Sequence, residues 1–517
     1  MDLSYDNPLI QTNIMKKFLT ILAIFGLLFV SCSDDDPVID PAPIEPDPIT
    51  YTSGTADFSN YVSVGASMTA GMSDAALFID GQTASYPNML AANFALVGGG
   101  TFNIPFMADN LGGLTLMGQP IPGAGNRLIL SFASGDPTPT PVSGTGSTEI
   151  SNVLTGPFNN MGVPLAKSFH LLAPGYGNLA GVPAGLANPF YARFATSPIS
   201  TVVGDAAAQN PSFFSLLIGM NDILAYASSG GDGVDQTGIN FDPSTYGSND
   251  ITNPNVFAGI YDGLLQTLTA NGAGGVVGNM PDITTIPYFT TVPHNPVPLD
   301  EGTAALLNGA YAEYNGGLAQ LQGLGLISVE ELAQRTISFT AGAGNAVVLL
   351  DEDLTDLTSF NPALVNMRQA TSEDMLVFTS QTIIGTLADP NNPTSINGVA
   401  VPLADKWVLT PEEQQAVAAA TMAYNQTIEA LATQYDLAFV DIKSFLEGLL
   451  ETGVPLSDGS TVTSTYATGG GFSLDGIHPS PRGYALLANL FIESINAKYG
   501  SDLPGVNPLD FTGLYIN

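Results

Sequence analysis

The sequence predicts an α/β fold in which a parallel sheet is covered by helices on both faces. Three short segments are almost entirely apolar, as expected for strands that are buried on both faces: Phe213–Gly219, Gly275–Met280 and Leu437–Asp441. Each has a helical candidate close to it in the chain. Alternation of such strands with helices is typical of the doubly wound α/β class, in which ligands bind at the carboxyl ends of the strands.

The other elements fit the same alternation. Tyr61–Gly65 is a short β-branched run that ends in glycine, and residues 85–96 then predict a helix with Pro87 in its first turn. Residues 256–270 carry an apolar stripe at helical spacing, which Asn271 and Gly272 end.

The clearest helix covers residues 411–435. Thr410 caps it and Glu413 completes a capping box, and the apolar stripe consists of Val417, Ala420, Tyr424, Ile428 and Leu431.

Two long stretches do not alternate in this way. Residues 98–204 are rich in glycine and proline, and residues 296–405 mix helices with loops. We interpret both as insertions into a domain of residues 58–517, where they wall a substrate cleft.

The amino terminus is typical of an exported protein. Lys16 and Lys17 precede a mostly apolar run, Phe18–Val30, that is too short to span a membrane. Ser31 and Cys32 follow and resemble a bacterial lipobox, so residues 1–32 are predicted to be a signal peptide that ends at a lipidated Cys32, with Met1 or Met15 as the start.

The segment after Cys32 predicts where the protein resides. Its acidic start, residues 33–36, resembles an export tag of surface lipoproteins, and residues 33–57 form an acidic, proline-rich tether. We therefore expect an outer-membrane lipoprotein of a Gram-negative bacterium, surface-exposed, which contacts the membrane only through its lipid anchor.

Composition excludes several partners and cofactors. The formal net charge of −36 opposes binding to nucleic acid, and one cysteine allows neither an internal disulfide nor a thiolate metal cluster. The acidic run Asp351–Asp353 lacks the spacing and glycine of a calcium loop. We expect no cofactor, no metal and a monomer.

A nucleophile and its base can be chosen from the sequence. Ser67 follows the first strand between small residues, where its hydroxyl would be exposed beside free amides, but serine needs a base. Of the three histidines, His478 lies three residues after Asp475, so a tight turn can bring the carboxylate to the imidazole. His170 and His294 flank proline-containing, aromatic loops and are expected to be structural.

Oxyanion donors are predicted at two further places. Asn221 follows an apolar strand within Gly219–Asp222 and offers a side-chain amide. Residues 160–166 form a turn-rich loop that offers a backbone amide.

These blocks together resemble the SGNH or GDSL-type serine esterases and lipases. The resemblance runs in family order through Gly65–Met68, Asn160–Ala166, Gly219–Asp222 and Asp475–Pro479, although Ala66 replaces the motif's aspartate. It implies a flavodoxin-like three-layer α/β/α fold and an oxyanion site made by the Ser67 amide, an amide of the second block and Asn221.

Within the second block, Leu165 stands where the family usually has glycine, and we assign the donating amide to it. Segments such as Gln82–Pro87, Met367–Ala370 and Pro402–Lys406 further resemble a subgroup of secreted bacterial lipoproteins.

The expected activity is carboxylic ester hydrolysis through an acyl-enzyme on Ser67, with His478 as base and Asp475 orienting it. The substrate is a lipid or short-chain acyl ester, or alternatively an O-acetyl group on a polysaccharide. The rival from another class is a surface protein that binds glycan or lipid on the same fold without turnover.

Overall fold

A computed structural model describes residues 49–133 and 137–516 of the chain. The chain divides into two units, residues 1–50 and 51–517, and the second is described below. The predicted signal peptide, Cys32 and most of the tether lie outside the described residues. No described helix is both long enough and apolar enough to cross a bilayer.

The folded region makes its first contacts shortly before the boundary expected from the sequence. The carbonyl of Thr52 accepts from the N–H of Asp502 at 3.3 Å, and the backbone N–H of Thr55 donates to the carbonyl of Tyr499 at 2.8 Å. Ala56 is buried against the core, as is Phe58.

A five-stranded parallel sheet forms the centre of this unit, which confirms the predicted α/β class. Its strands lie in the order β16-β9-β8-β1-β7, and all four pairings are parallel. Their bounds are Tyr61–Gly65 (β1), Asn160–Gly162 (β7), Phe213–Leu217 (β8), Gly274–Gly278 (β9) and Ala438–Val440 (β16).

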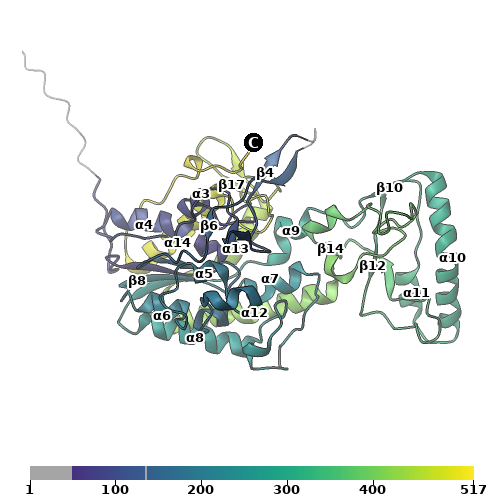
Figure 1. Cartoon of the computed structure of the whole chain (residues 1–517), viewed down its shortest axis with the longest axis horizontal. Coiled ribbons are helices and arrows are strands. Elements are labelled where there is room, and N and C mark those ends of the chain that lie inside the picture. Colours follow the sequence, from purple (N-terminus) through teal and green to yellow (C-terminus); the bar gives the residue numbers. More distant parts are fainter. Residues whose placement is uncertain (1–48, 134–136, 517) are drawn as a thin grey trace, which may run out of the picture. The chain divides into compact units, whose positions relative to one another are not determined.

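Helices cover both faces of the sheet, as Figure 1 shows. One face packs on α4 (Tyr86–Ala95) and α14 (Pro481–Tyr499). The other packs on α6 (Val202–Ala207), α8 (Pro254–Thr269) and α12 (Pro411–Gln434). Because successive side chains of a strand point to opposite faces, Tyr61 enters the first layer and Val62 the second.

One prediction about a connecting segment is wrong. The sequence predicts a loop from Asn160 to Ala166, but the first three residues form β7 at the edge of the sheet, paired with Ser63–Gly65 of β1. The Asn160 side chain bonds to the carbonyl of Thr69 and to its own strand, which holds this short polar segment in place.

The remaining short elements connect or flank the layers. They include α2 (Ser67–Ala70), α3 (Ile79–Thr83), α5 (Pro189–Ala192), α7 (Asn221–Ser228), α9 (Pro287–Thr290), α13 (Ile442–Glu451), β17 (Val454–Pro455) and β18 (Thr461–Val462).

The two stretches predicted as insertions have small sheets of their own. The first carries β2 (Leu114–Leu116), β3 (Gln119–Pro120), β4 (Leu128–Ser131), β5 (Thr138–Pro141) and β6 (Thr148–Glu149). The second carries β10 (Val297–Leu299), α10 (Glu301–Gly323), α11 (Val329–Arg335), β11 (Gly342–Asn345), β12 (Val348–Leu350), β13 (Met367–Gln369) and β14 (Met375–Leu376). The last of these pairs with β15 (Val408–Leu409), which lies just after the stretch.

The second stretch also encloses a hydrophobic core of its own. Residues of α10 such as Leu318 pack there against β12 and β13. This region therefore packs around a core of its own and is not a loose loop.

Candidate active site

Ser67 lies at the carboxyl end of β1, where it begins the four-residue helix α2. The chain turns so tightly here that a side chain on Gly65 would lie 2.3 Å from the carbonyl of Leu217 and 2.2 Å from Thr69 Oγ1. On the other side, Gly162 of β7 lets α2 approach closely, because a Cβ there would lie 2.3 Å from the Ala70 nitrogen. Two glycines thus fix where the Ser67 hydroxyl points.

Asp475 and His478 belong to one tight turn just before α14. The Asp475 carboxylate accepts from the backbone N–H groups of Ile477 and His478, both at 2.8 Å, which folds the segment back on itself. Gly476 supplies the left-handed conformation with φ 71°. Ser480 then caps α14, as the sequence predicts, by accepting from the N–H of Gly483.

The structure brings these three side chains into one hydrogen-bonded row. His478 Nδ1 lies 2.8 Å from Asp475 Oδ2, and His478 Nε2 lies 2.8 Å from Ser67 Oγ. All three residues are buried. An imidazole between a carboxylate and a serine hydroxyl can take the hydroxyl proton while the carboxylate stabilises the resulting cation.

Asp475 is held ionised despite its burial. Burial alone would raise its pKa, but the charge of His478 and hydrogen bonds from His478 and Ile477 outweigh burial and lower the pKa to about 2. The carboxylate therefore keeps its negative charge throughout the pH range in which an enzyme operates.

A second turn, Ser73–Ala76, supports this carboxylate and was not predicted from the sequence. Asp74 and Ala75 both have positive φ, 51° and 63°, so the Ala75 N–H points to Asp475 Oδ2 at 2.8 Å. Ser473 joins the two segments: its hydroxyl donates to Asp475 Oδ1 and accepts from the N–H of Asp74.

Asp74 is itself a buried acid close to Asp475. It accepts from the N–H of Leu474 at 2.9 Å. Burial raises the pKa of Asp74 to about 6, although the hydrogen bond from Leu474 opposes this shift. Hydrogen bonds thus connect the segment around position 74 to the segment around position 474.

Two of the expected oxyanion donors, the Ser67 amide and Asn221, belong to residues that line one pocket. As the first residue of α2, Ser67 has a backbone N–H without a partner inside the helix. Asn221 begins α7 directly after β8 and lines the same pocket as Ser67. One N–H of its side-chain amide donates to the carbonyl of Ala166 at 2.9 Å, which fixes the amide and leaves its other N–H for a ligand.

Leu165 takes the conformation that glycine adopts most easily, with φ 66°, and its side chain is exposed. Among the described residues, no hydrogen-bond acceptor is recorded for its N–H. The loop after it is anchored by Asp222, whose buried carboxylate accepts from the N–H of Ser168 at 2.8 Å and from its hydroxyl at 2.7 Å. Asp222 thus fixes the position of the second block, a role that the sequence did not indicate.

The other two histidines lie apart from this row. His170 stacks on Tyr176, and its Nδ1 accepts from the backbone of Lys167. Burial, together with the charge of Lys167, lowers the pKa of His170 to about 4, so it stays neutral. His294 lies in the loop before β10, where its carbonyl accepts from Val347.

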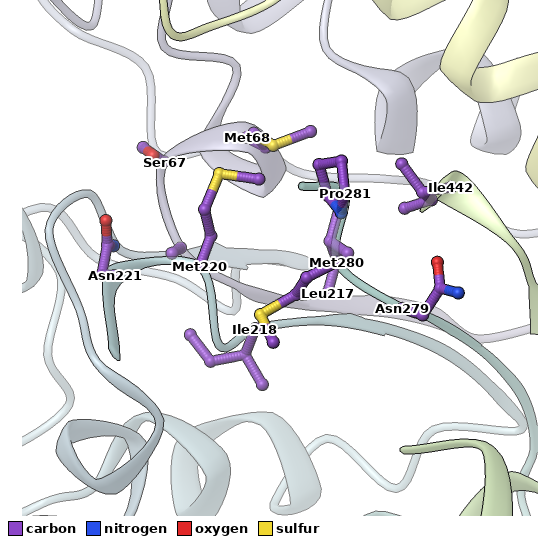
Figure 2. Close-up of a pocket in the computed structure, with 11 residues that line it drawn as sticks. Ser67, Met68, Leu217, Ile218, Met220, Asn221, Asn279, Met280, Pro281 and Ile442 are labelled. Atoms are coloured by element: carbon purple, nitrogen blue, oxygen red, sulfur yellow. The ribbon is translucent and has the colours of Figure 1, made fainter. Parts of the chain in front are cut away.

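Ser67 and Asn221 line one end of a pocket whose other walls are mostly apolar, as Figure 2 shows. A second pocket adjoins it and shares Met68, Met220, Pro281 and Ile442 with it. Its walls are apolar and come mainly from α13 and the start of α14: Ile442, Phe445, Leu446, Leu449, Phe472, Leu486 and Leu487. The candidate nucleophile therefore opens onto a hydrophobic cavity.

Comparisons with known proteins do not assign a function to this chain. No protein-family model matches the chain, and no curated protein matches it. Among solved structures it is similar to a mutant of Axe2, an acetyl-xylooligosaccharide esterase from Geobacillus stearothermophilus, with a TM-score of 0.30 and 11% identity over 86% of this chain and 96% of that one. A catalytic mutant of Axe2, described as an acetylxylan esterase, has a TM-score of 0.25 and 11% identity over 66% and 73% of the two chains. At such TM-scores the likeness assigns no activity to this chain.

Proposed function

We propose that this protein hydrolyses carboxylic esters through an acyl-enzyme on Ser67. The observation that supports this most strongly is the buried row from Asp475 through His478 to Ser67, with 2.8 Å at each step. A serine that serves only as a turn residue needs neither an imidazole on its hydroxyl nor a carboxylate behind that imidazole.

The reaction follows from these positions. Ser67 Oγ attacks the ester carbonyl as His478 Nε2 takes its proton, and Asp475 stabilises the imidazolium. The alcohol leaves with that proton, and His478 next deprotonates a water that attacks the acyl group. The carboxylic acid is released and the Ser67 hydroxyl is restored.

Charge on the substrate oxygen would be met by the amides of Ser67 and Leu165 and the side chain of Asn221. Each such donor typically contributes about 3–4 kcal/mol to the transition state. The fixed Asn221 amide and the anchored loop of Leu165 agree with this role, since catalysis gains most from donors that do not have to reorganise.

The apolar cavity favours an acyl chain longer than acetyl. A two-carbon acyl group has no methylene that could enter this apolar pocket. Each methylene that enters contributes about 0.8 kcal/mol, or roughly fourfold in kcat/KM. We therefore place lipid and short-chain acyl esters ahead of O-acetyl groups on polysaccharides.

Kinetics on p-nitrophenyl esters of increasing acyl length test the proposal. We expect kcat/KM to rise by roughly fourfold per methylene from acetate until the cavity is filled. Ser67→Ala is expected to abolish turnover without a change in melting temperature. Equal rates for this variant and the native chain would leave a binding protein as the better reading, and a preference for acetylated polysaccharide over every longer acyl ester would favour the O-acetylesterase.

We further propose the cellular address that the sequence indicates, a surface-exposed outer-membrane lipoprotein anchored through Cys32. Its support is the order of basic, apolar and small residues before that cysteine. Metabolic labelling with a fatty acid should mark the native chain and not Cys32→Ser, and label in both would contradict the anchor.

A further inference from the structure

Three carboxylates from separate segments meet at the start of α12, away from the candidate active site. They belong to Glu352, Asp405 and Glu413, and one oxygen of each lies within 4.8 Å of the others. Glu352 follows β12, Asp405 precedes β15, and Glu413 lies in the first turn of α12. The contiguous acidic run Asp351–Asp353 gives no sign of this cluster, because the other two members lie much further along the chain.

The fold itself forces these groups together. Leu349 and Leu403 form a parallel bridge, so the chain positions two or three residues beyond each of them lie side by side. The loop at Gly230 and Gly231 packs directly against the cluster, because a Cβ on Gly231 would lie 1.7 Å from Glu413 Oε1. Both glycines have positive φ, 65° and 80°, so this close approach is built into the loop.

Glu413 is the member that points to a ligand. Its side chain is only 5% exposed. One carboxylate oxygen, Oε2, accepts from the N–H of Thr410 at 2.6 Å. The other, Oε1, is buried and has no hydrogen-bond partner, and Asp405 Oδ1 is in the same position. Buried carboxylate oxygens are normally hydrogen-bonded, so two unpartnered ones within one cluster require an explanation.

No basic side chain of the described residues forms an ion pair with the cluster. None of the ion pairs between described residues includes Glu352, Asp405 or Glu413. Lys406, the neighbour of Asp405 in the chain, places its ammonium over the Trp407 ring, and the Arg368 guanidinium is bound to Asp351 and Asp374. Further acidic residues lie close by: burial raises the pKa of Asp405, and the negative charges of Asp232 and Asp351 raise it further.

We propose that these three carboxylates bind one calcium ion, which joins the second inserted region to α12. All the ligand atoms are hard oxygens, which Ca²⁺ and not Zn²⁺ or Cu²⁺ prefers. Ligand oxygens on opposite sides of a Ca²⁺ ion are about 4.6–5.2 Å apart, so a separation within 4.8 Å fits one ion between them. Calcium also tolerates the irregular geometry that three independent segments provide.

The bound ion would hold two parts of the fold together. Glu352 belongs to the region with its own hydrophobic core, and Glu413 belongs to a helix that packs on the central sheet. A shared cation would cancel the repulsion between these segments and replace it with attraction. Protons are the rival means of neutralisation, and the experiment below separates the two.

Calcium binding is measured on the full chain after treatment with a chelator, by isothermal titration calorimetry and by the melting temperature. We expect one Ca²⁺ per chain and a melting temperature that rises with Ca²⁺ concentration. Glu413→Gln, which keeps an acceptor for Thr410, and Glu352→Gln, an exposed change that folding tolerates, should each weaken binding by roughly tenfold or more, because each removes one charged ligand.

Glu412→Gln is the matched control, since it removes the same charge from the same helical turn but lies exposed and outside the cluster. It should bind Ca²⁺ as the native chain does. Three results would overturn the proposal: no heat and no melting shift with Ca²⁺ in the native chain, unchanged binding in Glu413→Gln, or binding of Mg²⁺ as tight as that of Ca²⁺. None of these readouts depends on ester hydrolysis.

Discussion

Replacing Asp475 with asparagine tests the acid of the proposed triad most sharply, because every group around its carboxylate is a donor. Oδ1 accepts from the N–H groups of Ile477 and His478 and from the Ser473 hydroxyl. Oδ2 accepts from the N–H of Ala75 and faces the His478 ring. An asparagine must turn its NH₂ group to one of these sides.

The two orientations have different costs. An NH₂ group at the Oδ1 position would meet two fixed backbone N–H groups, and hydrogen bonds to a charged acceptor contribute about 1.5–3 kcal/mol each. At the Oδ2 position it meets only the N–H of Ala75 and a ring that can change tautomer, so we expect this orientation. Nδ1 of His478 must then accept, Nε2 carries the proton, and the ring cannot take a proton from Ser67.

We therefore expect Asp475→Asn to lower kcat on the order of 10⁴-fold, or about 5.4 kcal/mol, as a wrong tautomer does in enzymes with a Ser-His-Asp triad. The measurement is steady-state hydrolysis of p-nitrophenyl butyrate together with the melting temperature. Asp205→Asn is the control, because Asp205 is also a buried acceptor, bonded to Tyr191 and Thr196, but on α6 away from the site. A folded Asp475→Asn within tenfold of the native kcat would refute the reasoning.

Three further predictions follow from other contacts. Asn221→Ala should lower kcat by on the order of 10²–10³ on the same ester while KM changes little, because the amide meets charge that forms only in the transition state; an unchanged kcat would remove Asn221 from the oxyanion site. Leu449→Phe narrows the apolar cavity and should reduce kcat/KM for octanoyl but not acetyl esters, and parallel losses on both would place the acyl chain elsewhere. Asp74 has a pKa of about 6 when folded, above its ordinary value of 3.8, so the folded state keeps a proton that the unfolded chain releases and stability falls as the pH rises from about 4 to 6. That loss amounts to about 3 kcal/mol, and urea unfolding of Asp74→Asn between pH 4 and 7 should lack it, whereas the same slope in both proteins would contradict the shift.

The sequence predicted the central layers because their signals are local. Phe213–Leu217 is buried on both faces and reads as apolar throughout, and the capping pattern at Thr410 marks the start of α12. Asp475 and His478 are three residues apart, so their pairing could be inferred from a turn. The sequence does not indicate β7, because a strand of three residues that begins with a polar one shows no periodicity. Only its pairing with β1 makes this segment a strand.

The parts of the site that were not predicted all depend on contacts between distant segments. The Ala75 N–H reaches Asp475 across 400 positions, and it does so only because two non-glycine residues adopt positive φ. Asp222 follows β8 and bonds to Ser168, which follows β7, although β1 lies between these two strands in the sheet. The Glu352 cluster likewise arises from a bridge between strands. Composition and spacing do not encode such pairings, because any of many acids could have filled each place.

The distance between the first and last pieces of the site along the chain has a consequence for when this protein can react. Ser67 and His478 are 411 positions apart, and the histidine lies just before α14, the last long helix. A chain that is still being synthesised has its serine but no base, so the proposed ester hydrolysis cannot begin. The proposed reaction would become possible only when α14 docks and brings His478 to Ser67. Turnover itself would then report that folding is complete.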